Sequence, residues 1–391
     1  MTTHASALIG PNPKGSVRRV SLAVRRALQA VRPQDSTLAV ACSGGPDSLA
    51  LLAAAIDQGA RLGMPVHSLT VDHRIRPESA AEAASVAALA RRLGATDSQV
   101  LTALGDSSGS RDGSSLGPEG DAREGRYRAL SRACRVLARA TGTTVYLLLG
   151  HTMDDQAETV LLGLGRGSGM RSIAGMLPLA APDSPQEPWM MRPLLEVRRN
   201  DTVLACKQLG LQAVDDPTNR ANGPWRTADG SALRRAAVRE FAMPALAGAL
   251  GQDPAPALMR TATQMRRDND CLDQAACELL DTVTVTPGVS QYTGRPAYME
   301  LDATKLAGLH DALITRILRF AALEAGASAD SLSSTHIENL LALVTNYSGQ
   351  GPIYLPGGII ATRVRLDKPT PRGTPGLTQP TEGAPIRIRF S

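Results

Sequence analysis

Short apolar segments alternate with helical patterns through the first half of the chain. Four runs have the length and β-branched content of buried strands, at residues 37–42, 65–71, 99–103 and 145–149. Stretches typical of helices accompany them, at residues 17–31, 47–58, 78–93 and 153–164. Strands that alternate with helices predict a doubly wound α/β domain, in which a parallel sheet carries helices on both faces.

A different pattern begins near residue 233. Four stretches have helical periodicity, at residues 233–250, 257–281, 305–325 and 331–344. Three short β-like segments follow, at residues 353–355, 359–364 and 386–390. We therefore expect a second, mainly helical domain over residues 233–391, with a basic end that is rich in short strands.

Segments rich in Gly, Pro or Ser separate these parts. Residues 105–120 predict a mobile loop within the first domain, because so many Gly and Ser residues bury little surface. Residues 223–232 predict a linker, which places the first domain at residues 17–222. Residues 1–16 are polar and contain two prolines, so they predict a flexible tail without the apolar core of a secretory signal.

Composition narrows the classes of protein further. The chain has 391 residues, of which 43 % are hydrophobic, yet no apolar run reaches the roughly 20 residues that span a bilayer. Its five cysteines form no C-x-x-C pair, which argues against a disulfide framework, a zinc ribbon or a four-cysteine iron–sulfur cluster. We expect a cytoplasmic protein with no membrane partner. The net charge of +5 is compatible with an RNA partner without demonstrating one.

The first candidate site is the turn that joins the first predicted strand to its helix. Its two glycines let the backbone approach a bulky anion, and the N–H groups that open the helix point toward that anion. The spacing differs from a Walker P-loop, and no Lys lies nearby. An ordinary capped turn is the alternative to phosphate binding. The candidate residues are Ser43, Gly44, Gly45, Pro46, Asp47 and Ser48.

Two further segments are predicted to reach the same crevice. Asp72 and His73 follow the second strand, and ligands of an open α/β sheet lie beyond the carboxyl ends of its strands. Arg123 and Arg126 are three residues apart, so they share one helix face and could clamp phosphates in a bidentate manner. Taken alone, each segment is more typical of an ordinary structure, a solvated turn for the first and a salt-bridged helix surface for the second.

A polar stripe opens the helix that follows the fourth strand. His151, Asp154, Asp155 and Glu158 have the spacing i, i+3, i+4 and i+7, which places them on one face of the helix N-terminus. Acids at this position commonly cap the helix and complement its dipole. A site for Mg²⁺ or for a cationic substrate is the other interpretation. Zinc is disfavoured, since no further His or Cys lies nearby in the sequence.

These segments, in this order and spacing, resemble the tRNA(Ile)-lysidine synthetases, a family of ATP pyrophosphatases with a PP-loop. The family patterns S-G-G-x-D-S, V-D-H-x-L-R, A-R-E-x-R-Y-x-x-L and G-H-x-x-D-D-Q-A-E-T correspond to residues 43–48, 71–76, 122–130 and 150–159. Further correspondences lie at residues 166–176, 192–195 and 216–219. The chain departs from the pattern in an apparent insertion at residues 225–232 and lacks the Lys-rich C-terminal module, so it resembles a short form.

The resemblance implies a fold like that of the adenine-nucleotide α-hydrolases, and an ATP-dependent ligase that forms a carbon–nitrogen bond. Such an enzyme joins free L-lysine to C2 of the wobble cytidine, position 34, of a tRNA(Ile) with a CAU anticodon. The cytidine is first adenylated, and pyrophosphate and AMP are released. The implied cofactors are ATP and Mg²⁺.

The resemblance also implies a role for each matching residue. ATP binding falls to the turn Ser43–Ser48 with Asp72, His73 and Gly150, and Mg²⁺ to Asp47 and Asp154. The catalytic and substrate-binding set is His73, Arg123, Arg126, His151, Asp154, Asp155, Glu158 and Arg166. The tRNA-binding set is Arg192, Arg234, Arg235 and Arg239. The basic C-terminal end adds Arg387 and Arg389, which lie two apart and so project from one face of a strand.

Two other functions stay open. A 2-thiocytidine-type PP-loop enzyme also modifies tRNA, but such enzymes carry paired C-x-x-C ligands, which this chain lacks. A non-catalytic protein with a degenerate PP-loop could bind RNA or nucleotides, although the intact acidic stripe argues against it. The oligomeric state is open as well, with a homodimer among the options.

Overall fold

The computed structural model describes residues 4–74, 78–103, 118–167, 169–182, 187–214, 221–223, 230–285, 299–329, 331–365 and 385–391. They form two compact units. Unit 1 extends to residue 263, apart from residues 169–171, which group with unit 2; unit 2 continues from residue 264. The division falls within helix α11 (Ala255–Val283) and not at residues 223–232, where we expected a linker. Helix α9 (Arg234–Ala237) and the π-helical turn η3 (Val238–Ala242) contact helix α6 (Met153–Gly165), so this segment belongs to unit 1.

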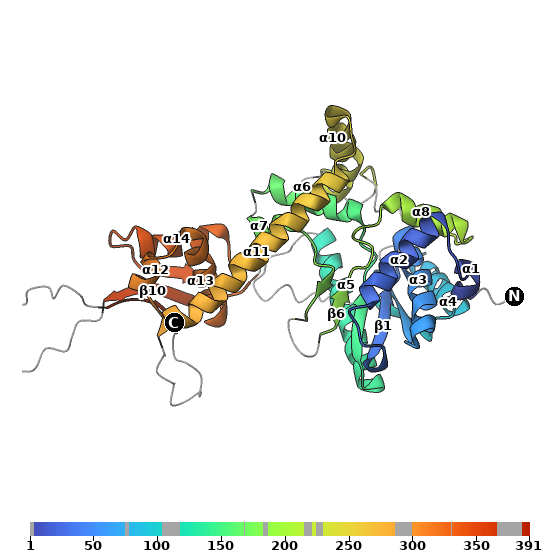
Figure 1. The fold of residues 1–391 in the computed structure, drawn as a ribbon, viewed down its shortest axis with the longest axis horizontal. Coiled ribbons are helices and arrows are strands. Elements are labelled where there is room, and N and C mark those ends of the chain that lie inside the picture. Colours follow the sequence, from blue (N-terminus) through green and yellow to red (C-terminus); the bar gives the residue numbers. More distant parts are fainter. Residues whose placement is uncertain are drawn as a thin grey trace, which may run out of the picture. The chain divides into compact units, whose positions relative to one another are not determined.

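Unit 1 is built on a six-stranded sheet in the order β3-β2-β1-β4-β6-β5. Figure 1 labels two strands of this sheet, β1 and β6, among the helices of the unit. Strands β1 (Ser36–Ala41), β2 (Val66–Asp72), β3 (Asp97–Thr102), β4 (Thr144–Leu148) and β6 (Trp189–Met191) are parallel. Strand β5 (Leu179–Ala180) is an antiparallel edge. Strands β2 and β3 follow β1 toward one edge of the sheet, whereas β6 and β5 follow β4 toward the other edge. The carboxyl ends of β1 and β4 therefore flank the topological switch point, where open α/β sheets bind their ligands.

Helices cover both faces of this sheet. Leu38 and Val40 of β1 pack in the core with α2 (Gly15–Leu28), α3 (Pro46–Leu62), α4 (Ser79–Leu93) and α8 (Arg199–Gln208). Ala39, between them, packs in a separate core with Leu130 of α5 (Pro118–Thr141). Alternate residues of a strand point to opposite faces, so β1 contributes to both cores. The predicted doubly wound α/β domain is confirmed.

The chain's first segment differs from the expected flexible tail. Within residues 4–16, helix α1 (Ala5–Ile9) packs against α3, and Ala5 and Ile9 are buried. A five-residue helix is unstable by itself, so its packing on α3 stabilises it. Residues 105–117 of the expected mobile loop lie outside the described residues, and Pro118 already begins α5.

Unit 2 contains a five-stranded antiparallel sheet in the order β7-β8-β11-β10-β9. The strands are β7 (Thr284–Val285), β8 (Met299–Asp302), β9 (Ile353–Leu355), β10 (Ile359–Arg365) and β11 (Ile386–Phe390). Leu301, Ala361, Ile388 and Phe390 share one core with helices α12 (Ala303–Ala307), α13 (Asp311–Glu324) and α14 (Ser334–Thr345). The expected helical domain with short strands is confirmed. Strands β7 and β8 were not predicted, because two and four residues carry too little periodicity.

The remaining described helices are short. Helix α7 (Met170–Ile173) precedes β5, and helix α10 (Met243–Leu250) follows η3. Across the described residues, no helix combines the length and apolar character needed to cross a membrane.

Candidate functional site

The turn after β1 has the geometry expected of an anion-binding loop. Gly44 adopts φ +85°, and a Cβ added there would come within 2.6 Å of Cγ2 of Val86, so glycine is required on two grounds. The Oγ of Ser48 accepts a hydrogen bond from the N–H of Ser43 at 3.1 Å and donates to the carbonyl of Gly45 at 3.0 Å. These bonds hold the loop folded at the N-terminus of α3.

Asp47, at the start of α3, faces a basic residue that the sequence analysis did not select. Its Oδ2 accepts a hydrogen bond from Nε of Arg199 at 3.2 Å, and its Oδ1 accepts one from the hydroxyl of Thr202. Burial raises the pKa of Asp47, while Arg199 and Thr202 act in the opposite direction. The partly buried carboxylate is thus held in one orientation beside the phosphate-binding turn.

Residues after β4 lie directly against this turn. A Cβ added at Gly150 would lie 3.2 Å from the carbonyl carbon of Asp47 and from the N atom of Ser48, so the segments that follow β1 and β4 lie against each other. His151 follows, and its Nδ1 is buried without a hydrogen-bond partner in the described part of the chain. Burial lowers the pKa of His151 to about 3, so the imidazole is neutral at physiological pH.

The first two acids of the predicted stripe are paired with arginines. Asp154 accepts hydrogen bonds from Nη2 of Arg198 at 2.8 Å and from the backbone N–H of Arg199 at 2.7 Å. Asp155 accepts one from Nη2 of Arg199 at 2.6 Å. Asp155 also accepts a 2.8 Å bond from the N–H of Thr152, which completes a capping box. The capping interpretation is therefore confirmed for Asp155, in addition to its place in the crevice.

The third acid, Glu158, is almost fully buried, and its partners come from two other segments. Arg239, on η3, donates to both carboxylate oxygens of Glu158 at 2.7 and 3.0 Å. Nη1 of Arg199 lies 3.5 Å from Glu158. Arg199 therefore links Asp47, Asp155 and Glu158, which makes it the central cation of the crevice. We refer to Asp154, Asp155 and Glu158 as the acidic wall.

Sequence reasoning missed Arg198 and Arg199, although a signal was available. Two adjacent arginines at the start of a helix oppose the helix dipole, so they require carboxylates nearby. The family patterns include the acids Asp154, Asp155 and Glu158 but not Arg198 or Arg199. A search for the counter-charges of those acids would have identified this arginine pair.

The predicted magnesium ligands do not form a preformed metal site. Asp47 is held by Arg199, and Asp154 by Arg198, so two different guanidinium groups already neutralise them. In the described ranges, no group of three or more His, Cys, Asp or Glu side chains is arranged to hold a metal ion.

Asp72 stabilises the turn after β2. It accepts hydrogen bonds from the hydroxyl of Ser79 at 2.6 Å and from the N–H of Arg74 at 2.8 Å. Although burial acts to raise it, these bonds lower the pKa of Asp72 overall. His73 is half-buried next to it, at the carboxyl end of β2. Asp72 and His73 therefore lie at the carboxyl end of β2, where the sequence predicted a ligand site.

Arg123 and Arg126 of α5 lie against one aromatic ring. Their Cζ atoms are 5.1 and 5.6 Å from the ring centroid of Tyr127. Arg192, a member of the predicted tRNA-binding set, is only 9 % exposed and donates to the carbonyl of Leu177 at 2.9 Å. Strand β6 ends just before Arg192, so this residue lies largely inside unit 1, and its role in tRNA binding stays a prediction.

Comparison with known proteins agrees with this geometry. A PP-loop domain model matches residues 20–246, and a TilS substrate binding domain model matches residues 301–366. The chain is 41 % identical over 352 residues to the tRNA(Ile)-lysidine synthase of Salinispora arenicola, which covers 89 % of this chain and 93 % of that protein. It is 40 % identical over 348 residues to that of Thermobifida fusca, covering 89 % and 94 %. The chain belongs to the tRNA(Ile)-lysidine synthase family.

The other predicted site residues do not all lie at the acidic wall. Arg166 is exposed at the C-terminus of α6, roughly 18 Å from Asp154 along the helix at 1.5 Å per residue. It therefore lies at the opposite end of α6 from the acidic wall. Arg234 is exposed and Arg235 is half-buried, whereas Arg239 of the same segment points to Glu158.

Arg387 and Arg389 have partners within unit 2. Nη1 of Arg387 lies 2.7 Å from Asp302, and Nη2 of Arg389 lies 2.7 Å from Glu300. The cause is strand β8, which pairs with β11 and sets these acids directly opposite the arginines. A role in tRNA binding stays a prediction for this pair, but each guanidinium group already has a carboxylate partner.

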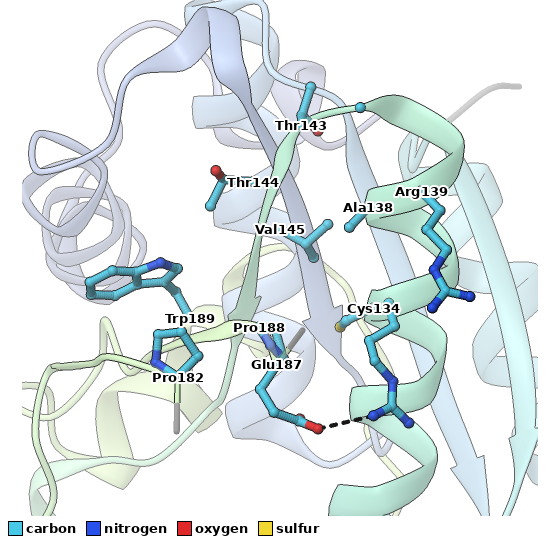
Figure 2. Close-up of a pocket in the computed structure, with 12 residues that line it drawn as sticks. Cys134, Ala138, Arg139, Thr143, Thr144, Val145, Pro182, Glu187, Pro188 and Trp189 are labelled. Atoms are coloured by element: carbon cyan, nitrogen blue, oxygen red, sulfur yellow. Dashed lines mark hydrogen bonds and ion pairs between the residues drawn. The ribbon is translucent and has the colours of Figure 1, made fainter. Parts of the chain in front are cut away.

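A hollow of about 570 Å³ lies elsewhere in unit 1 (Figure 2). Thr144, Val145 and Trp189 line it, and an ion pair of 3.2 Å joins Arg135 to Glu187. Thr144 begins β4, so this hollow is at the amino end of the strand, whereas the PP-loop lies at the carboxyl ends. It is not the predicted nucleotide crevice.

Proposed function

We propose that the chain is an ATP-dependent ligase that joins free L-lysine to C2 of the wobble cytidine, position 34, of a tRNA(Ile) with a CAU anticodon. One observation carries the proposal: Arg199 contacts both Asp47 of the PP-loop and two residues of the acidic wall, Asp155 and Glu158. A site for the phosphates of ATP and a site for a cationic amino acid are thus adjacent. Membership of the family supports the choice of reaction.

The PP-loop residues Ser43 to Ser48 bind the phosphates of ATP in this proposal. The backbone N–H groups at the start of α3 and the side chain of Ser48 face that position. ATP brings Mg²⁺, which keeps phosphate and water oxygens as most of its ligands and needs only one or two carboxylates from the protein. Asp47, beside the turn, is the proposed carboxylate for that ion, with Asp154 as the second.

The first chemical step is adenylation of the cytidine. Its O2 attacks the α-phosphorus, and pyrophosphate leaves from the PP-loop. The base must leave its stack to reach the crevice. His73, Arg123 and Arg126 are proposed to line the ATP and the activated base.

In the second step the ε-ammonium of lysine loses a proton, the resulting amine attacks C2, and the C2–O2 bond breaks so that AMP leaves with that oxygen. The acidic wall is the proposed binding surface for the lysine cation. Although burial opposes it, Arg199 and the hydrogen bonds from Thr152 lower the pKa of Asp155 to about 2, so this carboxylate is ionised at neutral pH. Lysine would compete there with Arg198, Arg199 and Arg239, which have the same charge.

The test is formation of lysidine by the purified full-length protein. We expect nuclease digestion and mass spectrometry of the tRNA to show lysidine at position 34 only when ATP and lysine are both present. A tRNA with uridine at position 34 is the matched control. ATP turnover without any lysine adduct, or sulfur transfer to the base, would refute the proposal.

A further inference from the structure

Four arginines of unit 1 lie close enough to act on one another or on Tyr127. Arg123 and Arg126 lie against its ring, and burial together with nearby Arg123 and Arg235 lowers the pKa of Arg126. Burial and Arg123 likewise lower the pKa of Arg192. We call Arg123, Arg126, Arg192 and Arg235 the arginine cluster. Its members come from α5, from the end of β6 and from α9.

The cluster lacks acidic partners in the part of the chain that the structure describes. No carboxylate there forms an ion pair with any of its four members, whereas Arg198, Arg199 and Arg239 of the same unit are all paired. Arg192 is buried and Arg126 and Arg235 are half-buried, whereas Arg123 is exposed. Like charges held close together and partly out of water repel one another unless an anion compensates them. The arginine cluster therefore has the charge of a site that receives its anion from outside.

Two buried polar atoms at the cluster have no partner. They are Nε of Arg192 and Nδ1 of His151. A buried donor without an acceptor is costly, and in native proteins such atoms commonly belong to a ligand site. The charges of Arg192, Arg123 and Arg126 act on the imidazole of His151, and the preceding residue, Gly150, lies against Asp47 and Ser48 of the PP-loop.

The sites already assigned nearby narrow the choice of anion for the arginine cluster. The PP-loop supplies a separate site for the phosphates of ATP, and the acidic wall repels anions. The proposed substrate offers one other anionic group, the phosphodiester linkage beside the target base. Planar guanidinium groups bind phosphate oxygens in a bidentate manner, and the ring of Tyr127 restricts the orientation of two of them.

We propose that the arginine cluster binds a phosphodiester of the RNA chain next to the target cytidine, and so orients that base toward the PP-loop. This inference rests on the proposed function. It assigns to RNA a basic surface that would otherwise be attributed to ATP.

The test compares Arg126→Gln with Arg132→Gln, a matched control on the same helix at an exposed position. An anticodon stem-loop RNA is the probe, and its affinity is measured at several salt concentrations. We expect Arg126→Gln to weaken RNA binding by roughly tenfold or more, as for loss of a charge-assisted hydrogen bond, and to reduce the salt slope by about 0.7–0.9. Arg126→Lys should restore part of the affinity. The unfolding midpoint of Arg126→Gln should match that of Arg132→Gln, so a loss of RNA affinity would not reflect a loss of folding.

A second arm identifies the phosphate. Neutral methylphosphonate linkages replace, one at a time, the phosphodiesters on each side of the cytidine. One of them should weaken binding to the wild-type protein but have little further effect on Arg126→Gln, because the two changes remove the same contact. Lysidine formation by the wild-type protein tests the proposed function separately. Loss of ATP-analogue binding with unchanged RNA affinity, or no change in either, would overturn the assignment.

Discussion

Replacing Arg199 with Met tests whether one guanidinium group holds the crevice together. Arg199 contacts Asp47 at 3.2 Å, Asp155 at 2.6 Å and Glu158 at 3.5 Å, and only 24 % of its side chain is exposed. Removing one partner of a buried ion pair typically costs about 3–5 kcal/mol, because the other charge stays buried without compensation. We expect a loss of that size in the free energy of unfolding at pH 7.

The pH dependence of that loss gives a sharper test. In the wild-type protein the pKa of Asp155 is lowered to about 2, against roughly 3.9 in an unfolded chain, which corresponds to about 2.5 kcal/mol. This stabilisation is present above pH 4 and is lost as the pH falls toward 2. Burial already raises the pKa of Asp47 in the wild-type protein, and Arg199 is the main group that opposes it. Without Arg199 the pKa of Asp47 should therefore lie still further above that of the unfolded chain. The folded variant then binds more protons than the unfolded one, so its stability should rise as the pH falls from 7 to 5.

The assay is urea unfolding at pH 5, 6 and 7, with Arg26→Met as a control at an exposed position. The double variant Arg199→Met/Asp155→Asn should recover part of the lost stability at pH 7, because it removes one uncompensated charge. A loss below about 1 kcal/mol that does not vary with pH would show that solvent already screens these carboxylates, and would refute the reasoning.

Three further predictions concern other parts of the molecule. Ser48→Ala removes the hydrogen bonds to Ser43 and Gly45, so ATP-dependent release of pyrophosphate should fall at least tenfold. The circular dichroism spectrum should be unchanged, and a wild-type rate of pyrophosphate release would contradict this prediction. Glu158→Gln should raise the KM for lysine more than it weakens tRNA binding. An unchanged KM in steady-state assays would show that Glu158 stabilises the fold and does not bind lysine. Arg389→Ala should destabilise unit 2 by about 1–3 kcal/mol in urea unfolding, because Glu300 loses its partner in the sheet. Arg365→Ala, at an exposed position of β10, serves as its control.

The sequence predicted the central part of unit 1 well for a physical reason. Strands such as residues 145–149 are continuous apolar runs, because both faces of a parallel sheet are buried, and the helices between them are long enough to show their period. The turn Ser43–Ser48 was recognisable because its glycines and helix start lie next to each other in sequence. These features are local, so a local pattern reveals them.

The features that the sequence did not predict depend on contacts between segments that are far apart in the sequence. The pairing of β8 with β11 brings Glu300 to Arg389, but the sequence of neither short strand indicates which strand it pairs with. Likewise, nothing near Asp47 in the sequence indicates Arg199, 152 residues further on. Helix α1 is too short to be stable by propensity alone, and only its contact with α3 stabilises it. Tertiary structure decides each of these cases.

The long separation between Asp47 and Arg199 has a consequence for the order of folding. Asp47, Asp155 and Glu158 come together as soon as the loops after β1 and β4 approach each other, but their shared cation arrives only with α8, and Arg239 arrives later still along the chain. Contacts of such separation close large loops and form slowly. The crevice should therefore be among the last regions of unit 1 to acquire protection from hydrogen exchange. A fragment that ends before residue 198 would contain the PP-loop and the acidic wall, yet it would lack the charges that allow them to meet.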